Sequence, residues 1–152
     1  MYSIRPRASK SRSGARNLSL LALAAVLVVS AVAVPMALAR GSKTVAGEAT
    51  APSLHKTVLT NTKGMTLYSL SVEKNGKFIC TGACTSTWPP LLVAAGTKPK
   101  GPVALGTIKR PEGKIQVTYK GLPVYTFDGD SKKGEANGEG IKDVGVWHAV
   151  TP

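Results

Sequence analysis

The sequence is poor in cysteine, acidic residues and aromatic residues, and it lacks the common catalytic motifs. Two cysteines and two tryptophans occur in 152 residues, and eight Asp or Glu stand against 20 Lys or Arg. No G-x-S-x-G, H-E-x-x-H or phosphate-binding glycine loop is present, so no constellation for hydrolysis stands out. Clustered arginines with interleaved aromatics are also missing, which disfavours nucleic acid as a partner.

The first 39 residues have the three parts of a signal peptide. A basic stretch from Arg5 to Arg16 precedes an almost wholly apolar run from Leu18 to Val34. Pro35 and the small-x-small sequence Ala37–Ala39 follow, which predicts cleavage after residue 39. The alternative is an uncleaved anchor, because residues 18–39 are long enough to cross a hydrocarbon core of about 30 Å. Either way we expect an extracytoplasmic protein, secreted or cell-surface associated, that contacts the membrane only through residues 18–39 if the signal is uncleaved.

The remainder is predicted to be a flexible tether, residues 40–55, and one domain, residues 56–152. From Arg40 onward, 15 Lys or Arg against 8 Asp or Glu leave a net charge of +7. Most of these charges are single lysines scattered through turns, as on a solvated surface. Such a surface can attract anionic cell-surface polymers, so we expect these polymers or envelope proteins as partners.

Short alternating segments predict strands, and no stretch after residue 53 has a helical period. The strand candidates are 66–72, 114–119, 124–127 and 146–150, separated by turn residues. The pattern predicts an all-β fold, a small antiparallel sandwich or open barrel preceded by the N-terminal signal helix.

An internal repeat divides this domain. Residues 64–68 match residues 121–125, each ending in a tyrosine. An acid follows five residues after each tyrosine, and a tryptophan follows 20 or 22 residues after it. The matching residues are Tyr68, Glu73 and Trp88 in the first copy and Tyr125, Asp130 and Trp147 in the second. We therefore predict two similar β-units, 56–100 (the first unit) and 108–152 (the second unit), that cover each other's apolar face.

The second copy resembles a known family. Tyr125, Phe127 and Asp130 fit Tyr-x-(Phe/Trp/Tyr)-x-x-Asp, the motif of bacterial secreted repeats or predicted lipoproteins of unknown function. The first copy departs from the motif, with Leu70 in place of the aromatic and Glu73 in place of the aspartate. The resemblance implies an exported location and a repeat fold, and it implies no established activity.

Structural roles are expected for the motif residues and the cysteines. We predict a tyrosine–acid hydrogen bond within each repeat, tryptophans that close the core, and a disulfide between Cys80 and Cys84. Four extended residues span about 13 Å, so the segment must turn to bring the cysteines within the roughly 7 Å that a disulfide allows between Cα atoms. The alternative is an aromatic site, built from Tyr68, Tyr125 and Phe127, for a flat ligand.

Acidic residues gather in the loop after Tyr125. Asp128, Asp130 and Glu139 fall at positions 1, 3 and 12 of a calcium loop, but lysines occupy positions 5 and 6, which excludes that loop type. A weak cation site from these three carboxylates remains an alternative. No cofactor is predicted, and metal or haem is not excluded.

These observations predict an exported, non-catalytic structural or ligand-binding module of the bacterial cell envelope. One alternative is an accessory protein of envelope redox, metal or haem chemistry that uses the acidic loop, His148 or the tyrosines. A weaker alternative is a cell-wall enzyme that cleaves glycans with Asp128 and Asp130 as paired carboxylates.

Overall fold

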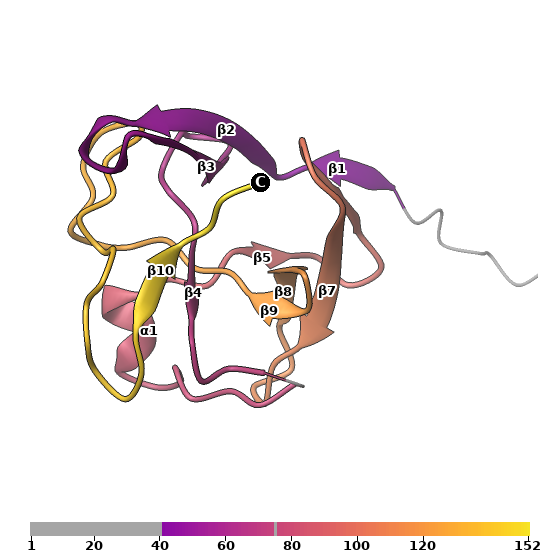
Figure 1. Ribbon diagram of the computed structural model, residues 1–152. Helices are drawn as coiled ribbons and strands as arrows, with labels where there is room; N and C mark the ends of the chain where they lie inside the picture. Colours follow the sequence, from indigo (N-terminus) through magenta and orange to yellow (C-terminus); the bar gives the residue numbers. More distant parts are fainter. Residues whose placement is uncertain (1–40, 75) are drawn as a thin grey trace, which may run out of the picture. The chain divides into compact units, whose positions relative to one another are not determined.

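The computed structural model describes residues 41–74 and 76–152 (Figure 1). The predicted signal segment, residues 1–39, lies outside the described residues. The elements of the described residues are β1 (Ser42–Thr44), β2 (Ala46–Ala51), the 3-10 turn η1 (Pro52–Leu54), β3 (Lys56–Asn61), β4 (Tyr68–Leu70), α1 (Cys84–Thr87), β5 (Leu92–Val93), β6 (Lys98–Lys100), β7 (Leu105–Lys109), β8 (Ile115–Tyr119), β9 (Leu122–Pro123) and β10 (Trp147–Ala149). Among the same residues, no helix is long and apolar enough to cross a membrane.

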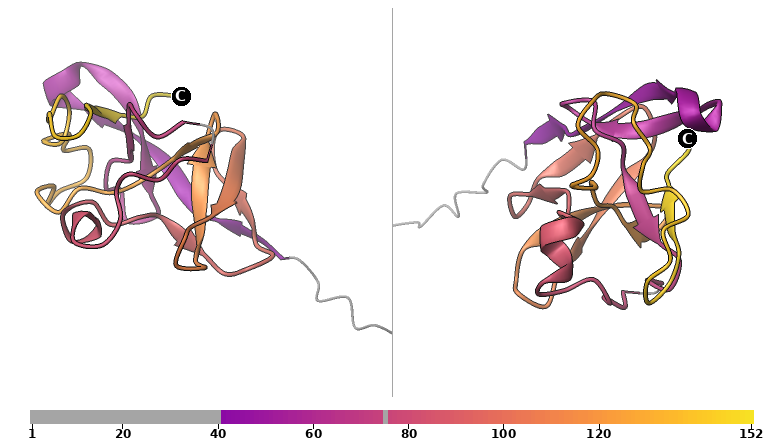
Figure 2. Two further views of the ribbon diagram at one scale, coloured as in Figure 1. Left: turned by 90° about the horizontal axis from the view of Figure 1, so that it is seen from below. Right: turned by 90° about the vertical axis from the view of Figure 1, so that its left-hand side faces the viewer.

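Strands dominate, which confirms the all-β prediction, and they form several small sheets, none of them closed. The largest has the order β5-β8-β7, with β9 also paired to β8. Three two-stranded sheets join β2 to β3, β4 to β10 and β1 to β6, the last pair being parallel. β4 and β10 run side by side in Figure 1 and in the right-hand view of Figure 2.

The β2–β3 hairpin corrects the predicted tether. β2 pairs antiparallel with β3 over its whole length, and Ala46 and Ala51 at its two ends are buried. The prediction of a flexible tether over 40–55 is therefore wrong for the described part of that range. The strand is held mainly by backbone hydrogen bonds, which do not depend on large side chains. Its Ala, Gly and Thr residues consequently gave no hydrophobic alternation to recognise.

The first unit does not complete its own sheet. The backbone N–H of Leu67 donates to the carbonyl of Leu59 (2.8 Å), which forms a hairpin-like pair. The third chain segment comes from the second unit, because Leu59 donates to Val150 and Val150 donates to Leu67, both at 2.8 Å. All three side chains are buried in one hydrophobic cluster.

The second unit is completed in the same way by the first. The N–H of Val124 donates to Val117 at 3.1 Å. Leu91, from the first unit, lies against this pair: Val117 donates to Leu91 at 2.8 Å, and Leu91 donates to Val124 at 3.0 Å. Leu91 lies three residues after Trp88, as Val150 lies three after Trp147. The two units are interleaved, and each supplies the closing segment of the other.

Candidate functional site

Tyr68 and Tyr125, the tyrosines of the two repeats, lie side by side in the core. Their backbones pair in both directions, with N–H to O distances of 2.8 and 2.9 Å. Both side chains are fully buried. The repeated motif therefore marks the place where the two units meet.

Each tyrosine bonds the acid of the other repeat. The Tyr68 hydroxyl donates to Asp130 Oδ2 at 2.7 Å, and the Tyr125 hydroxyl donates to Glu73 Oε2 at 2.8 Å. The predicted tyrosine–acid bonds exist, but their assignment to one repeat each is wrong. Sequence spacing could not distinguish the two pairings, because the tyrosine and acid have the same spacing in both copies.

The second oxygen of each acid holds the loop that follows it. Glu73 Oε1 accepts the backbone N–H groups of Ile79 and Cys80, both at 2.7 Å. Asp130 Oδ1 accepts the N–H of Asn137 at 2.9 Å. Cys80 and Asn137 each lie seven residues after the acid. The carboxylates thus tie their own loops to the other unit's tyrosine.

An aromatic stack completes the core. The rings of Trp88 and Trp147 are nearly parallel, with centroids 3.8 Å apart. Each meets its own repeat's tyrosine edge to face, Tyr68 at 5.4 Å and Tyr125 at 5.2 Å. Phe127 stacks on Trp88 at 4.4 Å. These rings pack on one another in one hydrophobic cluster, in which the tyrosines and tryptophans are buried and Phe127 is partly buried. The predicted aromatic residues therefore form part of the core.

Burial shifts the pKa values of both tyrosines and of Asp130. Burial and the hydrogen bond to its acid raise the pKa of each phenol well above 10, so Tyr68 and Tyr125 stay neutral and act as donors. Burial also raises the pKa of Asp130, while the hydrogen bond from Tyr68 opposes that rise. The tyrosines and their acids are buried, so this arrangement is suited to a structural role.

Arg110 is a core residue that the sequence reasoning missed. Its Nη2 donates to the carbonyl of Cys80 at 2.8 Å, and its Nη1 donates to Gln116 Oε1 at 2.5 Å and to the Tyr125 hydroxyl at 3.2 Å. Its Nε forms an ion pair with Glu112. The guanidinium is fully buried, and its fork-like set of donors suits a site with several acceptors.

A sequence signal for Arg110 existed. It is the sole arginine after Arg40, in a domain whose other basic residues are lysines. Arginine is the cation that proteins prefer for buried, multiply bonded positions. The guanidinium also lies over the ring of Phe78, 5.0 Å from its centroid.

The predicted disulfide is confirmed. Cys80 and Cys84 are bonded, with Cα atoms 5.2 Å apart. Cys80 is buried, its N–H donates to Glu73, and its carbonyl accepts from Arg110. The bridge therefore closes the loop that carries the contacts to the Tyr125 side of the core.

The acidic loop is not assembled as a cation site. Asp130 is bonded to Tyr68, and Glu139 accepts the N–H of Ala149 at 2.6 Å and lies 3.0 Å from His148 Nδ1. Asp128 is exposed. Within 41–74 and 76–152, no three His, Cys, Asp or Glu side chains are placed to share a metal ion.

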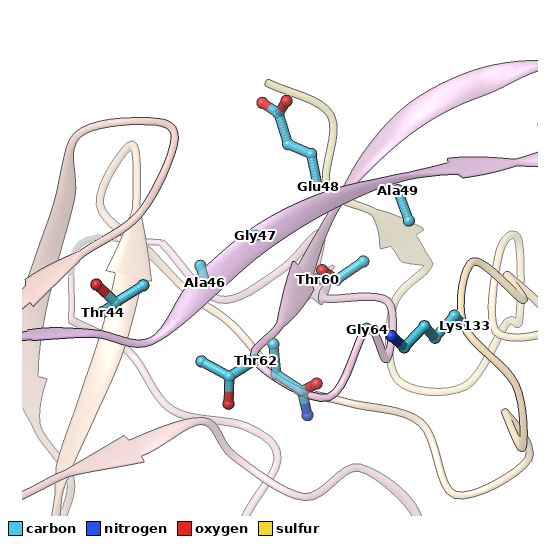
Figure 3. Close-up of a pocket in the computed structure, with 10 residues that line it drawn as sticks. Thr44, Ala46, Gly47, Glu48, Ala49, Thr60, Thr62, Gly64 and Lys133 are labelled. Atoms are coloured by element: carbon cyan, nitrogen blue, oxygen red, sulfur yellow. The ribbon is translucent and has the colours of Figure 1, made fainter.

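A shallow hollow lies beside the β2–β3 hairpin (Figure 3). Its volume is about 360 Å³, and threonines, alanines and glycines make up most of its wall. Glu48 and Lys133 are the charged residues that line it. The hollow is lined by no aromatic ring and by none of the predicted site residues.

Comparison with known proteins supports the resemblance for one unit. Residues 106–151 match the model of a family described as a secreted repeat of unknown function. This segment contains Tyr125, Phe127, Asp130 and Trp147. No curated protein and no solved structure matches the chain.

Proposed function

We propose that this protein is an exported, non-catalytic module of the cell envelope that attaches to anionic envelope polymers through its lysine surface. The family description of a secreted repeat supports the extracytoplasmic location. The observation that carries the binding proposal is the distribution of charge in the described residues.

Every lysine in the described residues is exposed, and none of them lies within ion-pair distance of a carboxylate. They are Lys43, Lys56, Lys63, Lys74, Lys77, Lys98, Lys100, Lys109, Lys114, Lys120, Lys132, Lys133 and Lys142. An exposed cation without a partner contributes its full charge to the field outside the protein. The lysines are therefore available to an external anion.

Five of the eight acids bond to groups of the protein itself. Glu73 and Asp130 are buried against the tyrosines. Glu112 is paired with Arg110, and Glu139 and Glu135 accept backbone N–H groups. These bonds do not remove the negative charges, but 15 Lys or Arg against 8 Asp or Glu from Arg40 onward still leave an excess of positive charge.

The parallel pair β1–β6 carries three of these lysines. Lys98 and Lys100 lie opposite Ser42 and Thr44, and Lys43 lies opposite Pro99. All three lysines are exposed, and neither strand contains an acid. Each lysine near an anionic surface contributes about 1 kcal/mol of attraction, so this strand pair offers a local test of the proposal.

The test measures binding of the purified domain to immobilised inorganic polyphosphate and to neutral dextran. We expect binding to polyphosphate that weakens as salt rises, because salt screens exposed charges. Changing Lys43, Lys98 and Lys100 together to Gln removes about 3 kcal/mol of attraction and should weaken binding roughly 100-fold.

The control changes the same three lysines to Arg, which keeps their charge. This variant should bind as the unaltered protein does, and all variants should unfold at the same denaturant concentration. Equal binding to dextran and polyphosphate would contradict the proposal. Loss of binding in the arginine variant would show that charge is not the cause.

A further inference from the structure

The face that each unit presents to the other is a docking surface. We infer that a second copy of this chain can supply the partner unit, by exchange of residues 105–152 between two chains. The inference comes from the way in which the units are joined, and it does not depend on the proposed binding to polymers.

The two units are joined by paired strands, side-chain hydrogen bonds and stacked rings. The strand pairs β4–β10 and β5–β8 both join a strand of the first unit to one of the second. The crossed tyrosine–acid bonds and the stacked tryptophans also join the two units. A unit separated from its partner would leave buried strand edges and carboxylates without partners, which is costly.

One short segment connects the units. Residues 101–104 form a bend between β6 and β7, and Gly101, Pro102 and Ala104 are exposed. If the bend opens, residues 105–152 can pair with the first unit of another chain and make every contact described above.

Exchange of an identical element is a low-cost route to a dimer. In the exchanged dimer, each first unit pairs with the second unit of the other chain, which gives two lobes with the same tyrosine–acid, tryptophan and strand contacts. The monomer and the dimer therefore differ chiefly in the conformation of the bend and in the entropy lost on association. The dimer is therefore favoured by high protein concentration. It would also join two lysine surfaces in one particle, which raises avidity for a polymer without any new contact.

The experiment uses two full-length variants that are each damaged in one unit. Leu59→Asp places a charge in the first unit's part of the core, and Val117→Asp does so in the second; both positions are fully buried. Each variant alone should be unfolded. Mixed and refolded together, they can form one lobe from the undamaged units, so we expect a heterodimer that regains cooperative melting.

The control mixture combines Leu59→Asp with Leu67→Asp, which damage the same unit. It should stay unfolded, because no undamaged first unit is present. Failure of the Leu59→Asp and Val117→Asp mixture to regain structure would overturn the inference.

A second measurement covers the case in which the single variants still fold. Deleting Gly101 and Pro102, which are exposed, shortens the bend and keeps Val103, which packs against the core. A shortened bend disfavours the closed monomer and favours exchange. We expect this chain to be dimeric by light scattering, with the melting behaviour of the unaltered protein. A folded monomer, or a chain that does not fold at any concentration, would contradict exchange.

Discussion

At one end of the paired tyrosines, Tyr68 donates to Asp130 and accepts a backbone N–H from the glycine-rich loop. At the other end, Tyr125 donates to Glu73 and accepts from the guanidinium of Arg110. The tyrosine–acid bonds are nearly equal in length, 2.7 and 2.8 Å. The surroundings differ, because a buried cation lies at the Tyr125 end and the Tyr68 end has only neutral donors among the described residues.

The same crossed tyrosine–acid bonds therefore form in two environments, one with a buried guanidinium and, in the part of the chain that the structure describes, one with neutral donors alone. Glu73 is one methylene longer than the aspartate of the motif, yet it bonds both the tyrosine and its own loop as Asp130 does. The Tyr125 end adds Arg110 and the disulfide of Cys80. The repeated tyrosine and acid are therefore common to both ends, whereas Arg110 and the disulfide stabilise the Tyr125 end alone.

The largest effect is expected from removing the cation at the Tyr125 end. Arg110→Met leaves the carbonyl of Cys80 and the oxygen of Gln116 buried without their donor. Each buried acceptor left without a donor costs about 1–3 kcal/mol, so the two together should cost roughly 2–6 kcal/mol. We expect a loss of stability of this size in urea unfolding.

Two matched variants sharpen this result. Arg110→Lys keeps the charge but offers one nitrogen in place of the guanidinium fork, so it should recover less than half of the loss. Lys132→Met removes an exposed cation near the Tyr68 end and should change stability by less than about 0.5 kcal/mol. A small loss in Arg110→Met would mean that the two ends are equivalent despite the cation.

A smaller loss of stability is expected from removing one tyrosine hydroxyl, and it distinguishes crossed pairing from pairing within one repeat. Tyr68→Phe leaves the buried carboxylate of Asp130 without a donor and should cost about 1–3 kcal/mol. In a double-mutant cycle, Tyr68→Phe and Asp130→Asn should couple by about 1 kcal/mol. Tyr68→Phe and Glu73→Gln should be additive within about 0.5 kcal/mol.

The same cycle at the other end serves as the control. Tyr125→Phe should couple to Glu73→Gln and be additive with Asp130→Asn, as measured by chemical unfolding. Coupling of Tyr68 with Glu73, and of Tyr125 with Asp130, would indicate that the bonds form within each repeat after all.

Much of this arrangement could be predicted from the repeat. The spacing of Tyr68, Tyr125 and their acids indicated two β-units with a shared interior. The expected export, together with a four-residue spacing of the cysteines, indicated the disulfide. The pattern could not show which acid each tyrosine meets, because both copies carry the same spacing. Pairing between distant segments depends on chain topology, which a local pattern does not encode.

The strand β2 and the buried Arg110 could not be predicted from local sequence patterns. β2 is built from small residues, so its hydrogen bonds to β3 leave no trace in hydrophobic periodicity. Arg110 belongs to neither repeat motif, and its acceptors lie up to 30 residues away in sequence. A single arginine among many lysines was the one sign of its role.

The smallest effect concerns the pH dependence of the Tyr68 end. Burial raises the pKa of Asp130 in the folded protein above its value in the unfolded chain, which is about 3.9. The folded state therefore holds this proton more tightly than the unfolded state does. The contribution of Asp130 to stability is full below the unfolded pKa and is lost as pH rises through the folded pKa.

Asp130→Asn removes this titration. The free energy of unfolding of the unaltered protein, minus that of the variant, should fall as pH rises above the unfolded pKa of about 3.9, with a slope of at most about 1.4 kcal/mol per pH unit for one proton. Asp128→Asn, at an exposed position of the same loop, corrects for the change in net charge. Because the Tyr68 hydroxyl opposes the rise in the pKa of Asp130, Tyr68→Phe should shift the fall to higher pH. A difference that grows with pH would mean that the folded protein stabilises Asp130 as an anion, which would contradict the raised pKa.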